Sequence, residues 1–443
     1  MHWGGNMLEK IFHLKAKNTD VKTEVLAGCT TFLAMAYILF VNPSILSESG
    51  MNAQSVFLAT AIASFIASVL MGLLANYPVA LSSGMGVNAL FTYTVCIQFG
   101  YSWQAALACV FISGLIFVLI SITGIRKLII NSIPKNLKLA IGAGIGFFIA
   151  FIGFANAGIV VSNPSTIVSL GNMLDPTVIL ALIGLVITIV LMVKKVNAAV
   201  FWDIVITTII GLIMSAFGLE GMPVIPETVI SFNFEMPTFM AFMEGFGEVF
   251  SDPRSIVIIF TFLFVDFFDT AGTLVAVGNN IGLVNENGEM ENVEKALLAD
   301  SIGTVVGACL GTSTVTSFVE SGSGVAAGGR TGLTACTTGI LFLLSIFFSP
   351  ILVMVTSSIT APALIVVGIM MSMQLGQIEW NLNNAIFAFT TVIMMVLCYS
   401  ISDGIAFGFL TYTISKLANK EAKDIKPIIY ILDIIFIIYF ITK

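Results

Sequence analysis

The sequence predicts an all-α polytopic membrane protein with about fourteen transmembrane segments in two inverted seven-helix repeats. The first observation is composition: 58% of the 443 residues are hydrophobic and only 10% are charged, which gives more apolar surface than a soluble domain buries. The second is that apolar stretches of roughly the 20 residues needed to cross a bilayer recur from residue 24 to the C-terminus. The third is a glycine-rich motif that appears once in each half.

The expected spans follow when the apolar runs are divided at Pro, Gly and charge clusters. The first seven lie at 25–41, 53–76, 85–99, 103–122, 136–158, 177–193 and 197–217. The second seven lie at 255–278, 293–310, 318–329, 332–355, 359–375, 384–400 and 403–418. A further apolar stretch at 427–441 has no place in this count.

These spans divide the chain into five parts. They are a polar N-terminal tail (1–23), a first repeat (24–217), an extracellular connector (218–253), a second repeat (254–418) and a C-terminal tail with the apolar stretch (419–443). The N-terminal tail lacks the apolar core and small-residue cleavage site of a signal peptide. We expect it to be retained.

The distribution of positive charge predicts the orientation. Lys and Arg gather in the N-terminal tail, from Arg126 to Lys138, at Lys194 and Lys195, and from Lys416 to Lys426. Alternate counting of the spans puts all four clusters on one side, which the positive-inside rule identifies as cytoplasmic. The connector holds five Glu but no Lys or Arg before Arg254, the one exception. The sequence thus predicts a multi-pass protein of the cell membrane with a cytoplasmic N-terminus.

Neither a metal site nor an enzyme is expected. The six cysteines fall within apolar segments and lack metal-ligand or redox spacing. Both histidines, His2 and His13, lie in the N-terminal tail, and no nucleophile motif is present. We therefore expect no bound metal and no organic cofactor, and nothing in the sequence favours nucleic-acid binding.

The repeated motif indicates where a substrate binds. Residues 83–89 (SGMGVNA) reappear as residues 321–327 (SGSGVAA), and an odd number of spans per repeat inverts the second copy relative to the first. In inverted-repeat transporters, short Gly-interrupted segments at matching positions form the substrate site, since broken helices expose backbone groups and helix ends at mid-membrane depth. Each segment is expected to have an extended stretch that leads into a short half-helix. Close packing of small residues is the alternative reading, but it leaves the matched positions and the neighbouring carboxylates unexplained.

Carboxylates within the spans are the main candidate functional residues, because a charge at bilayer depth costs at least about 2–3 kcal/mol. Asp269 lies in mid-span, and Glu320 directly precedes the second half-helix. Asp266 lies three residues before Asp269 on the same helix face. The two cannot easily both stay ionised in a dry environment, which suits a proton carrier. Asp300 fits a structural bond to a broken helix or a proton relay equally well.

The predicted site residues form two overlapping sets. The substrate-binding set is Asp269, Glu320, Asn88, Gly86, Ser321 and Gly322. The proton-coupling set is Asp266, Asp269, Asp300 and Glu320.

Six runs of residues resemble the adenine/guanine/hypoxanthine permeases of the nucleobase:cation symporter superfamily over nearly the whole chain. They are 30–38 (TTFLAMAYI), 41–43 (VNP), 84–89 (GMGVNA), 140–146 (AIGAGIG), 268–273 (FDTAGT) and 311–321 (GTSTVTSFVES). The resemblance implies fourteen spans, with a core domain (spans 1–4 and 8–11) that carries substrate past a gate domain (spans 5–7 and 12–14). It also implies uptake of purine bases driven by protons rather than Na⁺, frequent homodimers, and substrate binding by Asp269, Glu320 and Asn88.

Two other classes of protein stay open as alternatives. A related-fold anion transporter would suffer repulsion between its substrate and Glu320. A channel fits less well, since two broken helices around carboxylates suit an occluded site better than an open pore. Among purines, hypoxanthine and guanine present N1–H to a carboxylate, whereas adenine presents an acceptor there. The sequence therefore favours hypoxanthine and guanine.

Overall fold

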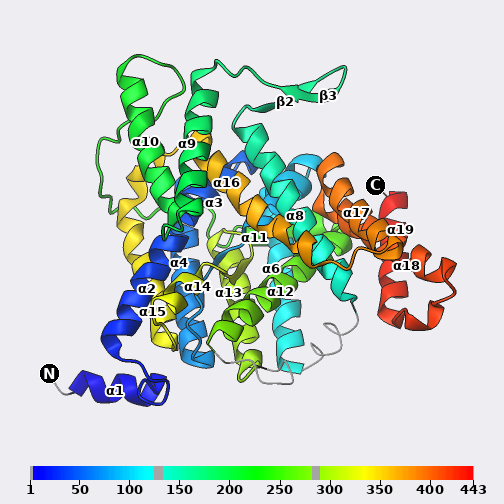
Figure 1. Ribbon diagram of the computed structural model, residues 1–443, viewed down its shortest axis with the longest axis horizontal. Coiled ribbons are helices and arrows are strands. Elements are labelled where there is room, and N and C mark those ends of the chain that lie inside the picture. Colours follow the sequence, from blue (N-terminus) through cyan, green and yellow to red (C-terminus); the bar gives the residue numbers. More distant parts are fainter. Residues whose placement is uncertain (1–2, 124–132, 282–289, 443) are drawn as a thin grey trace.

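The computed structural model describes residues 3–123, 133–281 and 290–442, and this part of the chain is almost entirely helical (Figure 1). The cationic cluster that begins at Arg126 lies partly outside the described residues. Nine helices of the described chain are long and apolar enough to cross a membrane. They run Val21–Ser49, Ala53–Ala75, Trp103–Thr123, Lys135–Asn156, Pro176–Val193, Ala199–Ala216, Ser255–Gly278, Gly332–Met354 and Ser357–Gln377. The prediction of a mostly helical, multi-pass membrane protein is thus confirmed, while the count of fourteen stays a prediction.

A short helix in the N-terminal tail comes first, and the rest of the first half follows the expected order of spans. Its helices are α1 (Trp3–Phe12), α2 (Val21–Met35), α3 (Ile38–Leu46), α4 (Ala53–Leu70), α5 (Met85–Ala89), α6 (Trp103–Thr123), α8 (Lys135–Asn156), α9 (Pro176–Val193) and α10 (Ala199–Ala216). The π-helical segment η3 (Leu90–Gln98) continues α5, and strand β1 (Leu81–Ser83) precedes it. A hairpin of β2 (Val160–Asn163) and β3 (Ile167–Leu170), which the sequence did not predict, projects from the body after α8 (Figure 1).

The second half repeats the pattern of a strand followed by a short helix. It contains α11 (Phe242–Ser251), α12 (Ser255–Asn280), α13 (Val293–Leu310), β4 (Val315–Ser317), α14 (Ser321–Ala326), α15 (Gly332–Ser345), η4 (Ile346–Met354), α16 (Ser357–Ser372), η5 (Met373–Gln377), α17 (Leu382–Leu397), α18 (Ile401–Ala418) and α19 (Pro427–Thr442). Helix α19 is the apolar stretch without a place in the count. It is fastened to α18 by hydrogen bonds from Thr413 to Asp433 and from Tyr439 to Asp403.

The two extended stretches meet at the centre of the fold. Strands β1 and β4 pair antiparallel, with Leu81 opposite Ser317 and Ser83 opposite Val315. All six strand residues are buried, and the pairing supplies partners for backbone groups that water cannot reach at this depth. Each strand then leads into its short helix, α5 or α14. The predicted extended stretches and half-helices are therefore present in both halves.

The connector 218–253 is more structured than its acidic, glycine-containing sequence indicated. Helix α11 buries Phe242, Gly245 and Val249 on one side, and the ring of Phe242 stacks on Phe111 of α6 with centroids 4.2 Å apart. A Cβ added to Gly245 would lie 2.3 Å from the carbonyl oxygen of Gln104. Glycine here lets the helix touch the backbone, so the residue that looked like a loop signal serves packing.

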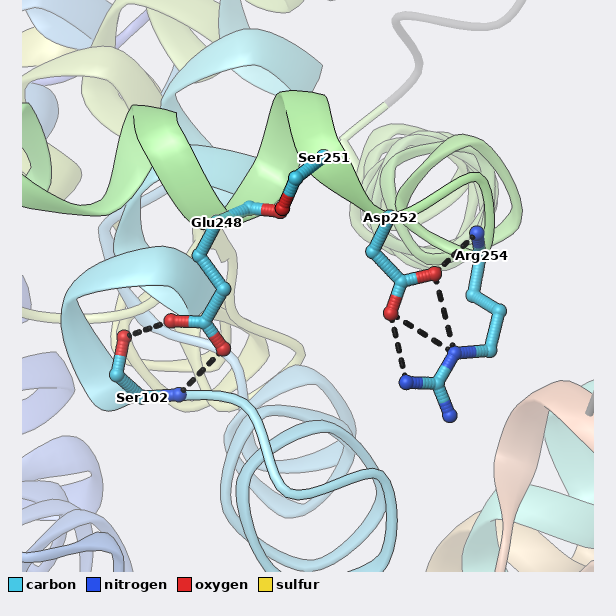
Figure 2. A network of polar contacts seen from close by, with 5 residues as sticks. All are labelled: Ser102, Glu248, Ser251, Asp252 and Arg254. Carbon is cyan, nitrogen blue, oxygen red and sulfur yellow. Dashed lines mark hydrogen bonds and ion pairs between the residues drawn. The ribbon is translucent and has the colours of Figure 1, made fainter.

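Polar contacts fasten the passage from α11 to α12 (Figure 2). The carboxylate of Glu248 accepts hydrogen bonds from the backbone N–H and the hydroxyl of Ser102. Arg254 donates from Nε and Nη2 to Asp252 Oδ2 at 2.9 and 2.6 Å, and these hydrogen bonds lower the pKa of Asp252. The charge of Arg254 is therefore compensated locally by Asp252.

Candidate functional site

The two predicted carboxylates lie close together beside the β1–β4 crossing. Asp269 is in the middle of α12, and Glu320 is the N-cap residue of α14. Both side chains are half-buried, and they interact with each other electrostatically. A Cβ added to Gly272, one turn after Asp269, or to Gly322 would meet no atom within 4 Å. The structure thus brings Asp269 and Glu320 near each other, and their contact with substrate stays a prediction.

A tyrosine that the sequence reasoning missed completes this carboxylate pair. Tyr37 lies in the two-residue break between α2 and α3, and its hydroxyl donates a hydrogen bond to Glu320 Oε1 at 2.6 Å. It also interacts electrostatically with Asp269. The local signal was weak, because Tyr37 stands in an apolar run where an aromatic residue is ordinarily a packing residue.

Three other predicted residues belong to the crossing itself. Asn88 is fully buried in α5; its Oδ1 accepts a hydrogen bond from the Ser313 hydroxyl, and its Nδ2 has no partner in the described part of the chain. The Ser321 hydroxyl accepts from the backbone N–H of Ala80 at 3.0 Å. At Gly86, an added Cβ would lie 2.7 Å from Ile145 of α8. In this conformation these residues join elements together, and their predicted contact with substrate stays a prediction.

Asp266 and Asp300 form a second, deeper pair of acids. Both are buried. Asp266 Oδ2 accepts from the Thr304 hydroxyl at 2.8 Å, and Asp300 Oδ1 accepts from Thr270 at 2.7 Å and from Ser317 of β4 at 3.2 Å. The other oxygen of each carboxyl has no partner among the described residues.

Electrostatic interactions connect the deep pair to the half-buried pair. Asp266 interacts with Asp300, Asp300 with Asp269, and Asp269 with Glu320. The four predicted proton-coupling residues therefore lie within electrostatic reach of one another, from the buried Asp266 and Asp300 to the half-buried Asp269 and Glu320. A buried carboxylate with an unpartnered oxygen is costly, so such a group is suited to holding a proton.

Hydroxyl and amide groups fix the surrounding backbone. The Asn42 amide donates to Thr60 and Thr312 at 2.7 and 2.8 Å, and Thr312 also bonds Ser83 at 2.7 Å. Span 1, span 2 and both extended stretches are thereby joined. The hydroxyl-rich run 312–317 indicates from the sequence that a polar network forms here. The partners of the Thr312 hydroxyl could not be inferred, because they lie more than 200 residues away along the chain.

Arg330 and the buried Glu24 hold the C-terminal end of the second half-helix. The guanidinium of Arg330 donates to the carbonyls of Val325 and Gly329, both at 2.7 Å, and so satisfies acceptors at the C-terminal end of α14. Glu24 of α2 accepts from the backbone N–H of Arg330 at 2.9 Å and from the Thr334 hydroxyl at 2.6 Å. Both residues hold α14 and α15 against α2.

Comparison with solved structures shows the fold. The transmembrane domain of a cyanobacterium bicarbonate transporter, BicA, superimposes with a TM-score of 0.65 at 16% identity, over 86% of this chain and 97% of that one. SLC26A9 superimposes with a TM-score of 0.63 at 11% identity, over 95% of this chain and 70% of that one. At these identities the likeness concerns architecture alone.

Comparison of sequences shows the family. Guanine/hypoxanthine permease PbuG of Bacillus subtilis is 49% identical, over 98% of this chain and 99% of its own length. Adenine permease AdeP of Escherichia coli is 40% identical, over 98% of this chain and 96% of its own length. Residues 22–407 match the model of the Permease family. These comparisons confirm the resemblance of this chain's motifs to the adenine/guanine/hypoxanthine permeases. The chain therefore belongs to the permease family and is a transporter rather than an enzyme.

Proposed function

We propose that this protein imports purine nucleobases, hypoxanthine and guanine in the first place, in symport with protons. The observation that carries the proposal is the pair of half-buried, electrostatically interacting carboxylates, Asp269 and Glu320, beside the paired strands that lead into the two half-helices. Each carboxylate offers two acceptor oxygens, and a purine presents several N–H donors around a planar ring. The names of full-length relatives, guanine/hypoxanthine and adenine permeases, support the same substrate class.

The group of four interacting carboxyls supports protons as the coupling ion. Asp266 and Asp300 each have one oxygen without a partner in the described chain, and both interact electrostatically with Asp269. Hydroxyls of Thr304, Thr270 and Ser317 hold the remaining oxygens. A proton taken up by this group changes its charge, and with it the attraction for a substrate that brings N–H donors.

Contacts between the proposed core and gate domains support alternating access. Glu48, just after α3, accepts hydrogen bonds from Tyr93 at 2.9 Å and from Asn156, the last residue of α8, at 3.1 Å. The Tyr399 ring packs edge-on against Tyr93 with centroids 5.7 Å apart. In the predicted topology these contacts lie on the extracellular side, where movement of the two domains against each other would break them. As the resemblance implies, we expect the transporter to form homodimers.

Anion transport is the second function that the comparisons raise. Solved structures of similar fold include a bicarbonate transporter and an anion transporter. Asp269 and Glu320 argue against an anionic substrate here, because negative charge on both sides of the site would repel it.

The test is uptake of radiolabelled hypoxanthine, guanine, adenine and uracil by cells that lack their own purine importers, with and without a protonophore. We expect purine uptake that collapses with the proton gradient. Uptake that ignores the gradient would refute proton coupling, and the absence of purine uptake would refute the substrate class.

Variants assign the residues within the same assay. Glu320→Gln and Asp269→Asn are expected to reduce hypoxanthine uptake at least about tenfold, since hydrogen bonds to charged groups contribute about 1.5–3 kcal/mol. Asp203→Asn is the control: this acid also lies within an apolar helix, α10, where it is buried and accepts a hydrogen bond from the Thr207 hydroxyl at 2.8 Å. Wild-type rates for Glu320→Gln or Asp269→Asn would remove that residue from the site.

A further inference from the structure

Tyr37 is placed by the fold to act on the site carboxylates. Its ring is only 1% exposed and belongs to the main hydrophobic core. Its backbone carbonyl accepts from the N–H groups of Phe40 and Val41, both at 3.0 Å, where α2 ends and α3 begins. A ring held on both sides by packing and by helix ends gives the hydroxyl one direction, which is towards Glu320.

The Glu320 carboxylate is held from outside its own helix. Although Glu320 is the N-cap residue of α14, its side chain makes no capping hydrogen bond to that helix. Its Oε1 accepts the Tyr37 hydroxyl at 2.6 Å, and both residues interact electrostatically with Asp269.

We propose that Tyr37 is a positioning residue that holds Glu320 as a hydrogen-bond acceptor and so makes the site favour 6-oxopurines over adenine. This inference rests on the proposed function. While the tyrosine donates to Oε1, the carboxylate is kept in one orientation, with its remaining lone pairs available to a ligand. Hypoxanthine and guanine present a donor, N1–H, to those lone pairs. Adenine presents the acceptor N1, and two acceptors facing each other leave both without a partner.

The consequence is a difference between substrates rather than a general loss of transport. A site built to hydrogen-bond one group of its substrate discriminates strongly against an analogue that lacks the group, because buried polar atoms are then left unpaired. Removal of the Tyr37 hydroxyl frees Glu320 to turn, and the geometry that distinguishes the two classes of purine is lost. If Tyr37 had a purely structural role, the loss of its hydroxyl would instead lower the amount of protein in the membrane or the maximum rate of transport, equally for every substrate.

Tyr37→Phe is the decisive variant, because it keeps the ring and removes only the hydroxyl. Initial rates of hypoxanthine uptake would be measured over a range of concentrations, with unlabelled guanine and adenine as competitors. We expect KM for hypoxanthine to rise about tenfold, Vmax per transporter in the membrane to stay within about twofold, and the inhibition constant of adenine to change less than about twofold. KM and inhibition constants do not depend on the amount of transporter, so reduced expression cannot imitate this result.

Tyr439→Phe is the matched control. Tyr439 is also a buried tyrosine whose hydroxyl donates to a carboxylate, Asp403, at 2.7 Å, but it lies on α19. We expect its KM values to match those of wild type. If Tyr37→Phe does not reach the membrane, Tyr37→His, which retains a ring N–H donor, takes its place and should keep a preference for hypoxanthine over adenine.

The outcomes separate this inference from the proposed function. Wild-type protein that transports no purine refutes the function itself. Wild-type protein that transports hypoxanthine, together with an unchanged KM in Tyr37→Phe or an equal change for hypoxanthine and adenine, refutes only the role of Tyr37. Loss of the preference in Tyr37→His refutes it as well.

Discussion

The crossing of α8 and α16 allows a sharp prediction, because two glycines let these helices touch through their backbones. A Cβ added to Gly368 would lie 2.5 Å from the Gly146 carbonyl oxygen, 2.6 Å from the Ala150 nitrogen and 2.7 Å from the Ala150 Cβ. Favourable contacts of carbon begin near 3.5 Å, so the helices must separate by about 1 Å to accept an alanine. Overpacking of this kind costs about 1–3 kcal/mol. We therefore expect Gly368→Ala to destabilise the protein.

The measurement is thermal unfolding of detergent-solubilised protein, followed as loss of the monodisperse peak of a fluorescent fusion. The expected decrease in midpoint is about 2–6 °C, from the cost above and the usual dependence of Tm on stability. Gly376→Ala is the control, because an added Cβ there meets nothing within 4 Å; its midpoint should stay within about 1 °C of wild type. An unchanged midpoint for Gly368→Ala would show that the two helices are not in backbone contact.

Three further predictions use the same unfolding assay. Asn42→Leu removes the donor to two buried threonine hydroxyls and should cost about 1–3 kcal/mol; wild-type stability would mean that this amide does not join the spans. In Glu24→Gln, the NH₂ of the new amide would face one of the three donors that the carboxylate now accepts, so the unfolding midpoint at neutral pH should fall. An unchanged midpoint would argue that Glu24 does not hold the start of α15. Arg254 lowers the pKa of Asp252 below its ordinary 3.8, so this pair stabilises the fold above that pH and the stabilisation is lost as pH falls through the lowered pKa. Near neutral pH, Asp252→Asn should therefore be less stable than wild type by at most about 1 kcal/mol and unfold at a lower temperature. In strong acid the unfolding midpoints of the two proteins should converge, and a constant difference at all pH values would contradict this.

The parts of the fold that could be predicted are those written locally in the sequence. Span length and composition identify the membrane helices, and the repeated motif identified both breaks, at β1–α5 and β4–α14. Asp269 and Glu320 were found because a charge in an apolar run is conspicuous at a single position. That the two breaks meet also followed, since matching segments of an inverted repeat form one site.

The remaining features depend on contacts between distant segments. Tyr37 and its partner Glu320 are 283 residues apart, and no local pattern distinguishes a tyrosine that bonds a carboxylate from one that packs against lipid. Helix α11 was missed because its glycines and acids resemble a loop, although its apolar residues recur on one face. The register of β1 on β4 and the bond from Ala80 to Ser321 likewise require the folded chain.

The antiparallel pairing of β1 with β4 also constrains how the protein is made. The backbone of residues 81–83 finds its partners at residues 315–317, which leave the ribosome only after most of the chain has been synthesised. Until then the first half holds an extended segment whose N–H and C=O groups must be satisfied by water, lipid headgroups or a membrane chaperone. We therefore expect a chain that stops before β4 to be less stable in the bilayer than the whole protein, because residues 81–83 lack their strand partners.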